Sequence, residues 1–97
     1  MFDPKLLGEI RDRFHHVDHC PYQGPRIFFE NAGGSLTLKS VVEVNTHLST
    51  IPDNQGRDNP ASRELVRIIN KARDDMKLFL GVSDGVVFTG ESGTELL

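Results

Sequence analysis

The strongest constraint on the fold is a long amphipathic segment that lies between two clear helix-boundary signals. Asn59-Pro60 pairs a residue that caps helix N-termini with proline, which favours the first helical position. Gly81 stands where a glycine commonly ends a helix. Between them runs one apolar stripe at helical spacing, formed by Leu65, Ile68, Ile69, Ala72, Met76 and Phe79. The pattern predicts a helix over residues 60–80, with Lys71 and Asp75 spaced to pair on its polar side.

The first half of the chain predicts two further helices and a strand. Asp3-Pro4 opens a first helix, which the turn-rich sequence CPYQGP ends by about residue 19. RIFFEN, at residues 26–31, is a short β-like run. Thr37 is placed to cap a second helix that ends before Pro52, and a polar loop, DNQGRDN, leads from there to the third helix.

The second half ends in a strand and the start of a helix. After a turn at residues 83–85, the sequence VVFT at 86–89 is a continuous apolar run of the kind buried in parallel sheets. The final sequence, GESGTELL, is a helix-start pattern followed by two leucines, so we expect a truncated segment. The order helix, strand, helix, helix, strand and helix start predicts an α/β fold.

Composition and charge bear on which partners and which compartment to expect. The hydrophobic fraction of 37% is too high for a disordered tail, and the net charge of −3 gives no reason to expect nucleic acid or an anionic membrane as the partner. The N-terminus has no apolar signal-peptide region, and no stretch is long enough to span a membrane. Cys20 is the only cysteine, which excludes an intrachain disulfide. We therefore expect a cytoplasmic protein.

The junction FTGESGTE, at residues 88–95, is the strongest candidate for chemistry. An apolar strand runs there into a turn rich in Gly, Ser and Thr, where a helix begins. Free backbone N–H groups at a helix N-terminus bind anions, and the hydroxyls of Ser92 and Thr94 can donate to phosphate oxygens. Gly93 would let the backbone approach a phosphate closely. The competing interpretation is a plain N-cap at Ser92 or Thr94, with Glu95 in the first turn.

Three stretches in this order resemble the class V aminotransferases and cysteine desulfurases, which are fold-type I pyridoxal-phosphate enzymes. VVFTGESGTELL resembles the strand and phosphate loop of that family, and IFFENAGGSLTLKSVVEVNTHL resembles its opening segment. SRELVRIINKARDDMKLFLGV resembles the helix between them. The matches span residues 26–97, about three-quarters of the chain.

The resemblance implies a division of the chain and a set of binding residues. Residues 1–25 would be an N-terminal helix and arm, and residues 26–97 the start of the transferase domain, truncated after the phosphate loop. The sheet would be incomplete, with helices packed on it. The residues implied to bind the cofactor phosphate are Ser92, Gly93 and Thr94, and those implied to border the substrate pocket are Asn31, Ala32 and Gly33. Family members are usually homodimers that act on small amino-acid substrates.

Two departures from the family pattern bear on this assignment. GESGTE carries one residue more than the usual loop, and NAGGS replaces a less flexible sequence at the substrate edge. In relatives the lysine that holds the cofactor covalently lies much further along the chain. The lysines here, Lys5, Lys39, Lys71 and Lys77, lie at positions unrelated to that motif. We therefore assign no catalytic residue and expect the segment to be inactive by itself.

Two other groups of residues are weaker candidates. His15 and His19, four residues apart on the expected first helix, could bind a metal together with Cys20, but a solvated helix end is the better interpretation because structural zinc normally needs four protein ligands. Arg57 and Arg63 could clamp a carboxylate or phosphate, or lie in a solvated loop. We assign no metal site. A small non-catalytic anion-binding module and a decayed gene product remain the alternatives to the enzyme fragment.

Overall fold

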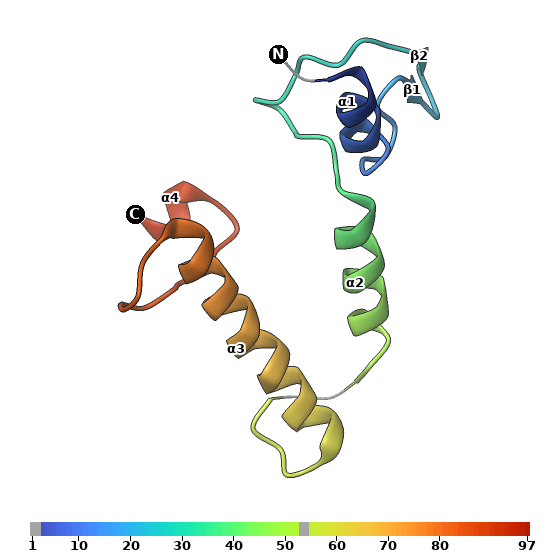
Figure 1. Ribbon diagram of the computed structural model, residues 1–97. Coiled ribbons are helices and arrows are strands. Elements are labelled where there is room, and N and C mark those ends of the chain that lie inside the picture. The colour runs from blue at the N-terminus through green and yellow to red at the C-terminus, as the bar shows by residue number, and fades with distance from the viewer. Residues whose placement is uncertain (1–2, 53–54) are drawn as a thin grey trace. The chain divides into compact units, whose positions relative to one another are not determined.

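The computed structural model describes residues 3–52 and 55–97, so the first two residues of the expected loop at 53–59 lie outside it. The described part contains four helices, α1 Pro4–Arg11, α2 Lys39–Ser49, α3 Pro60–Leu80 and α4 Gly93–Leu96. It also contains a two-stranded antiparallel sheet of β1 His19–Cys20 and β2 Gly24–Pro25 (Figure 1). The chain divides into two units, Met1–Pro52 and Asp53–Leu97, which are described separately.

The first helix begins as expected and ends early. Asp3 occupies the N-cap position before Pro4, although its side chain accepts no capping hydrogen bond. The expectation that this helix reaches about residue 19 is wrong, since α1 ends at Arg11. Its last turn tightens, because Phe14 N–H donates to the Arg11 carbonyl at 3.1 Å. The backbone then leaves helical geometry at His16, whose φ is 54°.

A short hairpin follows, with His19 opposite Pro25 and Cys20 opposite Gly24. Gly24 closes its turn with a φ of 83°, a conformation that glycine adopts without a steric penalty. Beyond the paired residues, Arg26 N–H donates to the Asp18 carbonyl at 3.0 Å. The hairpin contains CPYQGP, the turn-rich stretch that was expected to follow the first helix.

A single bridge between Phe14 and Leu38 ties the end of α1 to the start of α2. Around it, His15 N–H donates to the Thr37 carbonyl and Lys39 N–H donates to the Arg13 carbonyl, both at 2.9 Å. The bridge corrects the expected cap at Thr37. Because Leu38 is extended in this bridge, α2 begins at Lys39 with Leu38 at the N-cap position and no side-chain cap.

The helix α3 matches the sequence expectation at both ends. The Asn59 side chain accepts a hydrogen bond from Ser62 N–H at 2.7 Å, and Pro60 is the first helical residue. At the other end Gly81 has a φ of 69°, and Val82 N–H donates to the Lys77 carbonyl at 3.0 Å, which is the Schellman arrangement. The expected pair is also present, because Lys71 Nζ lies 2.5 Å from Asp75 Oδ2.

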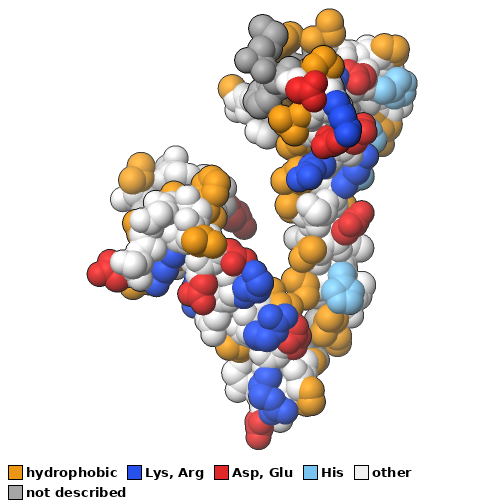
Figure 2. All heavy atoms as spheres, in the orientation of Figure 1, with side chains coloured by type: hydrophobic (Ala, Val, Ile, Leu, Met, Phe, Trp, Pro, Cys, Tyr) orange, Lys and Arg blue, Asp and Glu red, His pale blue; other side chains and the backbone are white. Residues whose placement is uncertain are grey.

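Apolar side chains stay at the surface throughout the described residues. None of their hydrophobic side chains is buried, and Ser62 is the only residue among them that is fully buried. Figure 2 shows the hydrophobic side chains as scattered surface groups. Among the most exposed are Ile27, Phe29, Leu78, Phe79, Val86 and Phe88. No described helix is long and apolar enough to cross a membrane.

The two expected strands pair with no other strand among the described residues. Residues 26–31 and 86–89 belong to no ladder in the described structure, which corrects their assignment as sheet strands. A strand needs a neighbour to accept and donate its backbone hydrogen bonds, and neither segment has one within its own unit. The described residues thus form helices and one small antiparallel sheet. The expected parallel sheet is not observed among them.

The start of α3 provides a first prediction. Replacing Asn59 with Ala removes the acceptor for Ser62 N–H and should destabilise the helix start by about 1 kcal/mol. Faster amide exchange at Ser62 and Arg63 would report the loss. The control is Asn70→Ala, an exposed position in the middle of α3, where alanine should slightly raise helix content. Equal effects of both substitutions would contradict the capping role.

Candidate functional site

The turn before α4 is capped by its own side chains. Ser92 occupies the N-cap position, and its Oγ accepts a hydrogen bond from Glu95 N–H at 3.2 Å. In return, Glu95 Oε2 accepts one from Glu91 N–H at 2.7 Å. The two bonds resemble a capping box shifted by one residue. The local alternative raised by the sequence, an N-cap at Ser92, is therefore present.

Two backbone donors in this turn are left without an acceptor. Gly93 and Thr94 are the first residues of α4, and no described residue accepts a hydrogen bond from either N–H. A Cβ added at Gly93 would meet nothing within 4 Å, so this face of the turn is open. At Gly90, by contrast, an added Cβ would lie 2.8 Å from Leu96 Cδ2, so the backbone there packs closely against the Leu96 side chain. The turn can thus offer adjacent N–H groups and the Thr94 hydroxyl to one small anion.

The residues expected to border a substrate pocket lie in a different turn. Asn31, Ala32 and Gly33 are exposed and follow the extended segment 26–30. Their turn is closed by Gly33 N–H, which donates to the Glu30 carbonyl at 3.0 Å. These residues belong to the N-terminal unit, and Ser92, Gly93 and Thr94 belong to the C-terminal unit.

The histidines do not form the arrangement that the helical spacing suggested. Because α1 ends at Arg11, His15 and His19 are not on one helix face, and His19 instead begins β1. The rings of His15 and His16 are 5.7 Å apart between centroids. Within residues 3–52 and 55–97, no three or more His, Cys, Asp or Glu side chains are grouped so that they could hold a metal ion.

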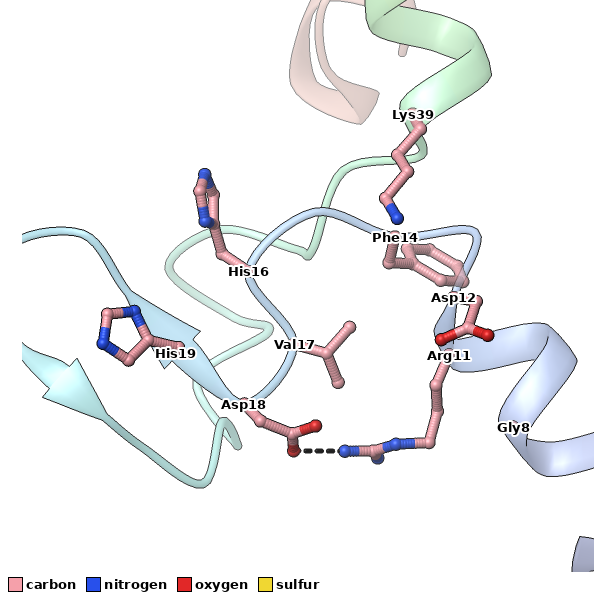
Figure 3. A pocket seen from close by; sticks show the side chains of 9 residues that line it. All are labelled: Gly8, Arg11, Asp12, Phe14, His16, Val17, Asp18, His19 and Lys39. Carbon is pink, nitrogen blue, oxygen red and sulfur yellow. Dashed lines mark hydrogen bonds and ion pairs between the residues drawn. The ribbon is translucent and has the colours of Figure 1, made fainter.

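A polar depression at the end of α1 was not foreseen from the sequence (Figure 3). It has a volume of about 410 Å³ and is lined in part by Arg11, Asp12, Asp18 and Lys39. Arg11 and Asp18 form an ion pair across it, while Lys39 extends toward Phe14. The two basic and two acidic side chains balance in formal charge, and His16 and His19 also line the depression. No local motif could reveal it, since the Phe14–Leu38 bridge brings Lys39 to this place.

The arginines of the loop before α3 serve the helix start. Arg63 Nη1 lies 2.6 Å from Asp58 Oδ1, with both side chains exposed, and Arg57 N–H donates to Ser62 Oγ at 2.9 Å. An exposed ion pair of this kind contributes little to stability. The geometry therefore supports the interpretation of a solvated loop that leads into a capped helix.

Cys20 has a perturbed thiol, which provides a second prediction. Backbone N–H groups of Tyr22 and Gln23 donate to the thiolate and, with the positive charge of Arg26, hold the pKa of Cys20 below its usual range. Alkylation of the folded chain by iodoacetamide should therefore reach half its maximal rate at a lower pH than alkylation of the chain unfolded in urea. A midpoint at or above the unfolded value would contradict the assignment.

Comparisons with known proteins add no information about this site. No family model, no curated protein and no solved structure matches this chain. The resemblance to class V aminotransferases therefore rests on the sequence stretches described above.

Proposed function

We propose that this chain acts as the opening segment of a pyridoxal-phosphate enzyme of the class V aminotransferase and cysteine desulfurase type. The activity would be transamination or desulfuration of an amino-acid substrate by a cytoplasmic homodimer. The observation that carries the proposal is the open turn at residues 92–94, where the sequence resemblance and the free backbone donors coincide.

The turn suits a phosphate group for three reasons. Gly93 and Thr94 offer free N–H groups at the positive end of α4, although this helix is only four residues long and its dipole is small. The Thr94 hydroxyl can donate to a phosphate oxygen. Ser92 Oγ already accepts from Glu95 N–H, but its own proton is free to donate outward.

The neighbouring carboxylates oppose this binding. Glu95 is held against the turn by its bond to Glu91 N–H, which places a negative charge beside the donors. A phosphate bound at Gly93 and Thr94 would be repelled by that charge. We therefore expect the turn to bind phosphate weakly unless a positively charged group also contributes to the site.

The residues present fit the cofactor phosphate but not its covalent attachment. Lys71 pairs with Asp75 on the polar side of α3, and Lys77 lines a depression with Val86 and Phe88. Among the described residues of this unit, neither of these lysines forms a hydrogen bond or an ion pair with residues 92–94. Pyridoxal phosphate, when bound, supplies a ring that stabilises negative charge at the substrate α-carbon. This chain would hold its phosphate through Gly93 and Thr94 and border the substrate through Asn31.

The exposed apolar surface supports a segment of a larger domain over an independent binding module. Phe79 is 83% exposed at the end of α3, and Phe88 is 78% exposed in the unpaired segment that follows. Apolar burial is the main force that stabilises folded domains. A self-sufficient module would need a buried core, which the described residues lack.

Phosphate binding at the turn is the third prediction. In an NMR titration of the whole chain, pyridoxal phosphate and inorganic phosphate should both shift the Gly93 and Thr94 amide signals, whereas pyridoxal should not. Glu95→Gln keeps an acceptor for Glu91 N–H and removes the opposing charge. It should tighten phosphate binding about two- to fivefold, which corresponds to the roughly 0.3–1 kcal/mol of a charge at a helix terminus.

Two further variants make the titration specific. Thr94→Val should weaken binding by removing the hydroxyl, and Glu43→Gln, the same charge change on α2, should leave it unchanged. Shifts that depend on net charge alone would contradict the proposed site.

The enzyme assignment is tested separately by reading the gene past the codon for Leu97. A frame that continues into a cofactor-binding aspartate and lysine would support it, and a stop codon in an expressed message would refute it.

A further inference from the structure

The extended segment at residues 26–30 exposes its apolar side chains to solvent. Its sequence is RIFFE, and Ile27 and Phe29 are 85% and 87% exposed. Arg26 lies over the ring of Phe28, with its Cζ atom 4.9 Å from the ring centroid. Arg26 and Phe28 are half-buried while Ile27 and Phe29 are exposed, the alternation that an extended chain gives, so Arg26, Phe28 and Glu30 share one face. Ile27 and Phe29 share the other.

One backbone edge of this segment is free. Arg26 N–H donates to the Asp18 carbonyl, which places that edge of the segment against the hairpin. The backbone groups of successive residues in an extended chain face opposite edges, so those of Ile27 and Phe29 face away from the hairpin. No described residue donates to or accepts from the backbone of Ile27 or Phe29. This edge can therefore take another strand.

The charges at the two ends of the segment select the strand that fits. In an antiparallel pair of two RIFFE segments centred on Phe28, Arg26 of each copy lies opposite Glu30 of the other. Ile27 then lies opposite Phe29 and exchanges both backbone hydrogen bonds with it. A parallel in-register pair would instead place arginine beside arginine and glutamate beside glutamate, which is unfavourable.

We propose that residues 26–30 form an antiparallel β-pair with the same residues of a second copy of this chain. The pairing is symmetric about Phe28, so a two-fold axis relates the two copies and each copy uses the edge of Ile27 and Phe29 once. It does not depend on the proposed function. Two short strands bury less than a standard protein interface, so the association is weak and depends on protein concentration.

Charge reversal tests the pairing and its register. Sedimentation velocity over a range of concentrations should show a reversible dimer of the whole chain. Arg26→Glu and Glu30→Arg, each alone, should weaken it about fivefold or more, because like charges then face each other at both ends. An equimolar mixture of the two variants should restore association, since each Glu of one copy again faces an Arg of the other. Glu43→Arg, the same charge change on α2, should have no effect.

Restoration in the mixture separates this proposal from damage to the fold. Arg26 also donates to the His16 carbonyl at 3.0 Å, so Arg26→Glu by itself could act through the loop after α1. A misfolded variant would not regain binding when it is mixed with Glu30→Arg.

Disulfide trapping gives an independent test of the two-fold centre. In a Cys20→Ser background, Phe28→Cys should form a disulfide-linked dimer under mild oxidation. Residue 28 faces itself in a non-hydrogen-bonded pair, where Cα atoms are about 4.5 Å apart, within the range that disulfides span. Ile27→Cys in the same background should cross-link much less. Position 27 of each copy lies opposite position 29 of the other copy, so the two introduced cysteines do not face each other. A monomer at all concentrations, a dimer insensitive to charge reversal, or equal cross-linking at both positions would overturn the proposal.

Discussion

Each unit of this chain depends mainly on backbone hydrogen bonds for its structure, since none of the described apolar side chains is buried in a core. In the N-terminal unit the key bonds surround the Phe14–Leu38 bridge, where Lys39 N–H reaches the Arg13 carbonyl. These bonds set where α2 begins and bring Lys39 to the polar depression at the end of α1. In the C-terminal unit the corresponding bonds are the caps of α3, at Asn59 and at Gly81. Since a single backbone bond contributes only about 0.5–1.5 kcal/mol, such units depend strongly on whatever covers their apolar surfaces.

The exposed apolar side chains connect the two proposals. On the C-terminal unit, Phe79 and Phe88 suggest the surface of an element that other parts of a larger domain would cover. On the N-terminal unit, Ile27 and Phe29 flank a free backbone edge whose end charges complement a second copy. The physical cause is the same in both places. Apolar area and unpaired backbone groups each gain free energy when they leave water with suitable partners.

The turn at residues 92–94 shows how a capped helix start and an anion site share the same atoms. Ser92 Oγ accepts from Glu95 N–H, and Glu95 Oε2 accepts from Glu91 N–H, as in an ordinary capped helix N-terminus. Gly93 and Thr94 keep their N–H groups free, since no helix start can satisfy all of its first amides internally. Whether such a turn binds phosphate therefore depends on the charges around it, and Glu95 works against binding.

The sequence by itself determined the features that depend on near neighbours. Both ends of α3 follow from Asn59-Pro60 and Gly81, because capping bonds and a left-handed glycine involve only residues a few positions apart. The Ser92 cap and the Lys71–Asp75 pair were predictable for the same reason. Only the tertiary structure decided that α1 ends at Arg11 and that α2 begins at Lys39, since the bridge joins segments more than twenty residues apart. It also decided that residues 26–31 and 86–89 stay unpaired, because β-propensity favours an extended backbone but a sheet requires a partner strand.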